Sequence, residues 1–175
     1  TNLPSVSKGD LVKGSDSAKV TLIEYADFQC PACASYFPLV KMLSLEFSKD
    51  LKIAYRFLPL TAIHKNAMLA AQTAFAAGKQ NKFWEMHDKL FENQNSWANT
   101  DPKDIFIGYA KDLGLDLEKF KTDLDSDSAK QFINNEKNKA ISIGVNSTPT
   151  FFLNGKHIKN PASFDEFKKI IQDEI

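Results

Sequence analysis

Cysteine is scarce in this sequence, whose 175 residues include only Cys30 and Cys33. One bridge closing so short a loop adds little restraint to the unfolded chain, so a disulfide-stabilised scaffold is excluded. No charge of one sign predominates either, because 22 Lys and Arg balance 22 Asp and Glu. A chain without net charge lacks the field that draws proteins onto phosphate backbones, which argues against a nucleic-acid binder.

Long apolar runs and low-complexity segments are also missing. No apolar run approaches the roughly 18 residues that span a bilayer, and seven Gly with seven Pro are too few for a collagen-like or low-complexity chain. With 43% hydrophobic residues, the chain fits one compact domain with its own core. It begins at Thr1, without Met and without an apolar segment before Asp10, so we expect that a signal or anchor was removed or that the chain was trimmed.

Hydrophobic periodicity predicts strands at both ends of the chain and helices between them. The expected strands are 8–13, 20–25, 51–58, 149–153 and 156–158, and the expected helices are 31–49, 62–77, 82–91, 102–113, 117–124, 128–143 and 163–175. Strand, helix and strand over 20–58 indicate a βαβ unit with parallel strands. Both ends must therefore meet in one sheet, which predicts an α/β fold in three parts: 1–61, an inserted helical domain over 62–143, and 144–175.

The two cysteines form a CPAC motif that follows the strand over 20–25. Pro31 suits a first helical position, which places Cys30 at the helix N-terminus, where oriented N–H groups stabilise a thiolate. Cys33, one turn further on, faces the same side and is expected to be more buried. This favours a redox pair that forms and resolves disulfides. The alternatives are a structural bridge and half of a zinc site, although the three histidines lack zinc-finger spacing.

Several motifs together resemble the DsbA-type branch of the thioredoxin-fold oxidoreductases. DFQCPAC (27–33) after a strand and TPTF (148–151) resemble the thioredoxin fold, and HKNAMLAA (64–71) and FWEMHDKLFENQ (83–94) resemble the helical domain of that branch. The likeness covers about 9–175. It implies a thioredoxin fold, with a mixed central β-sheet flanked by helices and an inserted all-helical subdomain, in which 1–61 is the first half, carrying CxxC, and 144–175 the second half.

The resemblance also implies a substrate site around the cysteines. The residue matching Pro149 is cis in that family and lies beside the active cysteines, which leaves the backbone of Thr148 free to pair with an extended substrate segment. An ordinary proline at a strand start is the alternative. Pro31 and Ala32, between the cysteines, are expected to border the substrate. Phe28 belongs either to an apolar substrate surface or to the core.

Glu24 matches the buried acid that lies beneath the second cysteine in that family. A carboxyl group in an apolar strand has a raised pKa and exchanges protons with Cys33 while a mixed disulfide is resolved. An edge-strand or solvated Glu is the alternative. His64 either faces the site or serves in capping or packing, whereas His87 in a helical stripe is most simply structural.

The function implied is a thiol-disulfide oxidoreductase enzyme that donates the Cys30–Cys33 disulfide to folding extracytoplasmic proteins. Cys30 forms the mixed disulfide and Cys33 resolves it, with no bound cofactor and no metal. The implied partners are thiol-bearing unfolded proteins and a DsbB-like or quinone-linked membrane protein. We expect a monomer secreted to the bacterial periplasm or the exterior of the cell envelope.

Two rival functions stay open. In a disulfide reductase or isomerase, the same cysteine pair would act in its reduced form on substrate disulfides. In a non-enzymatic module, the cysteines would instead serve to bind a metal or a peptide. Strongly oxidising relatives carry histidine where Ala32 stands. Ala32 therefore predicts a milder oxidant than CPHC relatives.

Overall fold

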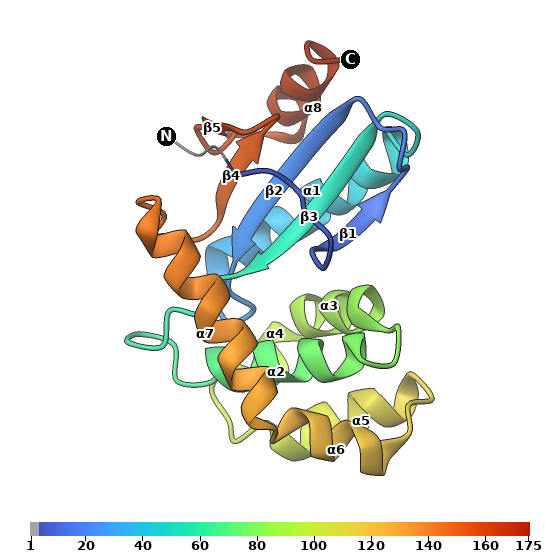
Figure 1. Ribbon diagram of the computed structural model, residues 1–175, viewed down its shortest axis with the longest axis vertical. Coiled ribbons are helices and arrows are strands. Elements are labelled where there is room, and N and C mark those ends of the chain that lie inside the picture. The colour runs from blue at the N-terminus through green and yellow to red at the C-terminus, as the bar shows by residue number, and fades with distance from the viewer. Residues whose placement is uncertain (1–3) are drawn as a thin grey trace.

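A five-stranded mixed sheet forms one half of the molecule in the computed structural model, which describes residues 4–175 (Figure 1). In spatial order its strands are β1 (Leu11–Gly14), β3 (Leu51–Phe57), β2 (Val20–Ala26), β4 (Thr150–Leu153) and β5 (Lys156–Ile158). Only β2 and β3 run parallel, and the other neighbours are antiparallel. The central strand β2 therefore comes from the first part of the chain, and its neighbour β4 from the last.

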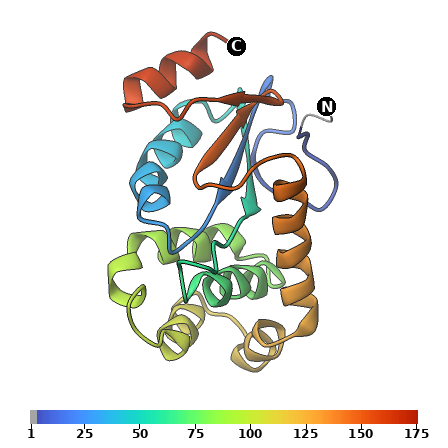
Figure 2. The same ribbon diagram turned by 90° about the vertical axis from the view of Figure 1, so that its left-hand side faces the viewer.

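The parallel pair is joined by helix α1 (Pro31–Glu46), which confirms the predicted βαβ unit. Figure 2 shows α1 on one face of the sheet, together with α8 (Phe164–Gln172). Apolar side chains from both helices and from the sheet share one buried cluster, among them Leu43 and Phe167. This packing holds the second half of α1 against the sheet and so fixes the direction of the helix across that face.

Six helices lie between β3 and β4 and form the other half of the molecule (Figure 1). They are α2 (Ala67–Gly78), α3 (Phe83–Glu92), α4 (Gln94–Trp97), α5 (Lys103–Asp112), α6 (Leu117–Leu124) and α7 (Asp127–Ser142). Helix α7 returns to the sheet on the face opposite α1, where Ala140 packs with Ile23 and Tyr25 of β2 (Figure 2). Within residues 4–175, no helix is both long and apolar enough to cross a membrane.

The structure corrects several boundaries and adds one element. The strand expected from residue 8 begins at Leu11 after a turn at Lys8 and Gly9, and the last helix ends at Gln172 rather than Ile175. The helix expected from residue 62 begins at Ala67, because the main-chain N–H groups of Leu60 and Asn66 bind the side chains of Asp27 and Gln29, which holds 60–66 as turns. Helix α1 ends at Glu46 rather than near residue 49, followed by a turn into β3. The short helix α4 was not predicted at all.

Candidate active site

The two cysteines lie at the junction between the sheet and the helical half, where β2 ends and α1 begins. Cys30 is the N-cap residue of α1 and Pro31 its first residue, as predicted. The Cys30 N–H donates to the carbonyl oxygen of Asp27 at 3.0 Å, which closes a turn between strand and helix. Both cysteines are free thiols. Cys30 is 7% exposed and Cys33 fully buried, so only the first is accessible to another protein.

The surroundings of Cys30 favour its thiolate. A hydrogen bond from the Cys33 thiol lowers the pKa of Cys30 to about 5, with further help from Thr148 and from the main-chain N–H groups of Ala32 and Cys33. Partial burial opposes this lowering. These N–H groups belong to the first turn of α1, where the helix dipole favours negative charge. Cys30 therefore favours, at neutral pH, the thiolate form that a nucleophilic cysteine requires.

Cys33 has the opposite character. Burial raises its pKa well above the ordinary value, and the hydrogen bond and negative charge of Cys30 raise it further. A main-chain hydrogen bond from Asp27 opposes these effects. Because one thiol ionises readily and the other does not, the pair holds one negative charge and one proton at neutral pH.

The loop before β4 brings Thr148 and Pro149 against Cys30. The peptide bond between them is cis. The Cys30 sulfur lies 3.5 Å from the carbonyl oxygen of Thr148. The ladder between β4 and β2 begins further on, at Thr150 opposite Tyr25, so the main chain of Thr148 lies outside the sheet beside the sulfur. The Thr148 hydroxyl is buried without another hydrogen-bond partner within residues 4–175.

Glu24 lies in the central strand, between Tyr55 of β3 and Phe151 of β4. The alternative of an edge or solvated glutamate is therefore wrong, because the residue is 3% exposed. Burial raises the pKa of its carboxyl group to about 7, and the positive charge of Lys13 opposes the rise. The negative charge of Glu24 also contributes to the raised pKa of Cys33.

The predicted role of Phe28 at a substrate surface is wrong. Its side chain is 1% exposed and stacks on Tyr55, with ring centroids 5.1 Å apart, and it packs against Phe91 of α3 at 4.9 Å. Phe28 therefore joins the sheet to the helical half as a core residue. Pro31 and Ala32, in contrast, are exposed at the start of α1, directly after Cys30.

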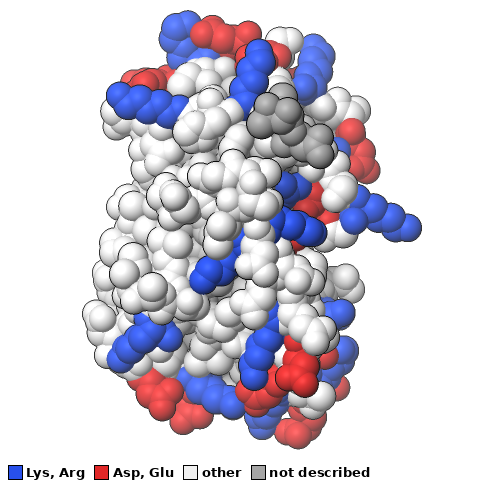
Figure 3. Space-filling model, turned by 60° about the vertical axis from the view of Figure 1, so that its left-hand side comes forward, with Lys and Arg blue, Asp and Glu red and all other residues white. Residues whose placement is uncertain are grey.

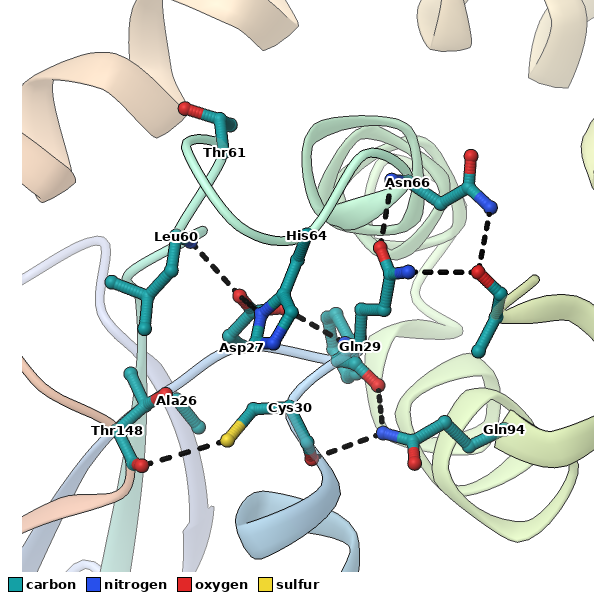
Figure 4. A network of polar contacts seen from close by, with 12 residues as sticks. Ala26, Asp27, Gln29, Cys30, Leu60, Thr61, His64, Asn66, Gln94 and Thr148 are labelled. Carbon is teal, nitrogen blue, oxygen red and sulfur yellow. Dashed lines mark hydrogen bonds and ion pairs between the residues drawn. The ribbon is translucent and has the colours of Figure 1, made fainter.

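Buried polar side chains that the sequence analysis missed connect residues 27–30, here called the cysteine turn, to the helical half (Figure 4). Gln94 of α4 donates through Nε2 to the carbonyl oxygens of Phe28 and Cys30, at 2.7 and 3.0 Å. Gln29 donates to Ala98 O at 2.7 Å and accepts from the N–H of Asn66. The only signal available in the sequence was the polar D-F-Q segment directly before CPAC.

Asp27 and His64 form a further buried contact beside this turn. The Asp27 carboxylate is fully buried, and its Oδ2 lies 2.7 Å from Nδ1 of His64 (Figure 4). His64 precedes α2 without capping it, and its side chain packs on Asp27, three residues before Cys30. His87 lies among aromatic rings of the core, including Phe28 and Tyr55, and donates or accepts at Asp88.

The arrangement suits thiol–disulfide exchange, which requires an accessible thiolate, a second thiol within bonding reach and a path for an incoming chain. Cys30, Cys33 and the loop at Thr148 supply these parts. Among residues 4–175, no three His, Cys, Asp or Glu side chains are grouped as ligands for a metal ion.

Comparisons with known proteins agree with this chemistry. Residues 6–173 match the family described as Thioredoxin. The chain is 41% identical over 147 residues to an Na(+)/H(+) antiporter NhaA 1 of Salinispora arenicola, which aligns 84% of this chain with 22% of the antiporter. The chain thus spans less than a quarter of the length of that curated relative.

Solved structures with the same architecture cover nearly the whole chain. Oxidised BdbD of Bacillus subtilis has a TM-score of 0.82 at 29% identity, with 95% of this chain and 93% of that chain covered. For α-DsbA1 of Wolbachia pipientis the TM-score is 0.82 at 22% identity, with 98% and 92% covered, and this likeness concerns the fold. The chain therefore belongs to the thioredoxin family and resembles its DsbA-like thiol-disulfide oxidoreductases in sequence motifs, fold and paired cysteines.

Proposed function

We propose that this oxidoreductase acts as an oxidase, which donates the Cys30–Cys33 disulfide to folding proteins. The observation that carries the proposal is the opposite displacement of the two thiol pKa values, to about 5 for Cys30 and well upward for Cys33. A stabilised Cys30 thiolate lowers the free energy of the reduced protein. The oxidised protein is then a stronger acceptor of electrons, by about 30 mV for each 1.4 kcal/mol.

The exchange takes two steps. A substrate thiolate attacks the Cys30 sulfur, so that a mixed disulfide forms, the Cys30–Cys33 bond breaks, and Cys33 leaves and takes up one proton. A second substrate thiolate then attacks the substrate sulfur and releases Cys30 as a thiolate. The substrate loses two electrons and two protons, of which the reduced protein keeps both electrons and one proton, while the other proton passes to solvent.

Glu24 is the group we assign to the proton that reaches Cys33. A carboxyl group with a pKa of about 7 is present in both protonation states at neutral pH, as an acid–base catalyst should be. In the reverse attack, by which Cys33 resolves a stalled mixed disulfide, Glu24 takes the proton back.

The surface around Cys30 suits an unfolded chain of no fixed sequence. Figure 3 shows a broad face with few charged atoms on the side that carries the β3–α2 loop and the end of α7. Ile63 and Ile143 are exposed there, at 72% and 40%. We assign substrate contact to Pro31, Ala32, Pro149 and the main chain of Thr148, where apolar and main-chain contacts require no particular substrate side chain.

The proposal extends to the protein's surroundings. An oxidase of this kind works on unfolded, thiol-bearing substrates outside the cytoplasm, where disulfides persist. Its dithiol must be reoxidised, and a DsbB-like or quinone-linked membrane protein would take the electrons. The cysteine pair is its whole redox centre, without a bound cofactor, and we expect it to act as a monomer.

The first test is the redox equilibrium of the cysteine pair against glutathione, measured by thiol trapping and mass. We expect a reduction potential more positive than about −200 mV, towards the value of about −120 mV for DsbA. A more negative potential, near the −270 mV of thioredoxin, would overturn the oxidase and favour the reductase or isomerase. Failure to form a reversible disulfide would overturn the enzyme altogether.

A second test separates the roles of the two cysteines. Cys33→Ser, mixed with an unfolded protein activated as a mixed disulfide, should accumulate a stable covalent complex through Cys30. Cys30→Ser should form none, because Cys33 is buried. Equal trapping by both variants would contradict the assignment of Cys30 as the attacking thiol.

A further inference from the structure

The Asp27 carboxylate has no part in the exchange proposed above, although it lies three residues before Cys30. Its side chain is fully buried. Oδ1 accepts the N–H of Gln29 at 2.8 Å, and Oδ2 accepts the N–H of Leu60 at 2.9 Å beside its 2.7 Å contact with His64 (Figure 4). Burying a carboxylate costs several kcal/mol unless it is paired and hydrogen-bonded, so this carboxylate binds its three partners firmly.

The main chain of Asp27 contacts both cysteines. Its carbonyl oxygen accepts the Cys30 N–H at 3.0 Å, and its backbone hydrogen-bonds Cys33. A shift of Asp27 therefore moves a polar group at each member of the pair. The residue whose side chain is held by these three partners therefore contacts both cysteines through its main chain.

His64 links this residue to a separate, exposed segment. It lies in the β3–α2 loop, where its neighbours Ile63 and Lys65 are exposed, while its own side chain is 16% exposed. It also lines a surface pocket with Gln29 and Pro31 at the edge of the cysteine turn. Of the three groups that contact the carboxylate, only His64 contributes a side chain. Substituting His64 therefore removes one contact of Asp27 and keeps both hydrogen bonds from main-chain N–H groups.

We infer that Asp27 and His64 are positioning residues, whose contact holds the turn at 27–30 in the geometry that stabilises the reduced cysteine pair. The inference rests on the proposed function only in taking Cys30–Cys33 as a redox pair. It assigns part of the oxidising strength of that pair to a histidine that comes from outside the CxxC motif.

The test compares His64→Leu, which removes the donor, with His64→Gln, which restores a neutral donor of similar reach. His157, an exposed histidine on β5, supplies the matched control His157→Leu. For each folded protein we would measure the equilibrium constant for reduction by glutathione and the pH midpoint of thiolate absorbance at 240 nm. We expect His64→Leu to lower the equilibrium constant at least threefold and to raise the midpoint, with His64→Gln recovering at least half of the loss on a logarithmic scale.

If His64→Leu does not fold, His64→Gln with Asp27→Asn carries the test, since both keep side-chain size and polarity. Asp27→Asn should then lower the constant at least threefold, and adding His64→Gln to it should cause no further fall. The inference is overturned if His64→Leu matches wild type or His157→Leu, if His64→Gln recovers nothing, or if adding His64→Gln to Asp27→Asn lowers the constant further. Each ratio of variant to wild-type equilibrium constant can be measured whatever the wild-type reduction potential is. A potential like that of a reductase would therefore contradict the oxidase proposal but would not decide the role of Asp27 and His64.

Discussion

The sulfur of Cys30 lies 3.5 Å from the carbonyl oxygen of Thr148, although 118 residues separate them in the chain. The contact joins the N-terminus of α1 to the loop that enters β4. An attacking thiol and a stretch of main chain outside the sheet thus lie side by side. Under the function proposed above, a substrate cysteine that reaches Cys30 would be flanked by backbone with which its own backbone could pair.

Replacing Ala32 should change the oxidising strength. Ala32→His adds a polar, partly cationic group at the first turn of α1, which stabilises the nearby Cys30 thiolate. We expect the equilibrium constant for reduction by glutathione to rise about tenfold, which corresponds to about 30 mV. Ser35→His, exposed one turn further along the same helix, is the matched control. An unchanged or lower potential in Ala32→His would refute the idea that Ala32 makes a milder oxidant.

The stability of the reduced protein should depend on pH through Cys30. Its folded pKa of about 5 lies below the ordinary value of 9.0, so the stabilisation is fully present above pH 9 and is lost as pH falls through 5. The oxidised protein has no such thiolate. We expect the melting temperature of the reduced form, minus that of the oxidised form, to increase between pH 5 and 9. Thermal unfolding of both forms across this range measures the difference, and a constant difference would contradict the lowered pKa.

Glu24 should limit stability at neutral and higher pH. Its folded pKa of about 7 lies above the model-peptide value of 4.5, so its favourable contribution is present below pH 4.5 and lost as pH rises through 7. Glu24→Gln removes this titration and should stabilise the protein at pH 8 by roughly 3 kcal/mol relative to its effect at pH 4. Urea unfolding at the two pH values tests this.

The same substitution should slow the exchange, because Gln carries no proton to Cys33. The matched control is Glu118→Gln on the surface of α6, where the side chain is 90% exposed. Faster or unchanged exchange in Glu24→Gln would argue that water, and not this carboxyl group, carries the proton.

Gln94 should contribute to the free energy of unfolding, although it lies 64 residues from Cys30 in the sequence. Gln94→Leu removes the donor that the carbonyl oxygens of Phe28 and Cys30 share. The Cys30 oxygen keeps the N–H of Ala34 at 3.1 Å, whereas the buried Phe28 oxygen is left unsatisfied, which costs about 1–3 kcal/mol. Denaturant unfolding of the reduced protein should show a loss in that range. The exposed neighbour substitution Asn95→Leu should cost much less, and equal losses would mean that the two hydrogen bonds contribute nothing.

The parts of the site that the sequence predicted are those with local signals. Pro31 marks the first turn of α1, and the CxxC spacing fixes which cysteine lies at the helix end, so the N-cap position of Cys30 followed directly. The apolar run around Glu24 likewise indicated a strand, because a short continuous run of apolar residues is typical of a strand buried on both faces.

The polar contacts around the cysteine turn had no such signal. Asp27 binds His64, and Gln94 binds Cys30, across 37 and 64 residues respectively, and hydrophobic periodicity says nothing about pairs of that kind. Helix α2 begins late for the same reason, since Asn66 uses its N–H to bind Gln29. Phe28 was ambiguous because its burial depends on Tyr55 and Phe91, which only the fold brings to it.

The central strand β2 has a neighbour from each end of the chain, which bears on how the protein is made. Ribosomes deliver the N-terminal segment first, so the reactive thiols exist while Thr148 and the strand after it are still unsynthesised. Until those residues arrive, Glu24 lacks one of its two neighbouring strands and the sulfur of Cys30 lacks its backbone neighbour. Premature termination anywhere in the helices would therefore release a polypeptide with paired thiols but without the surface that guides their use.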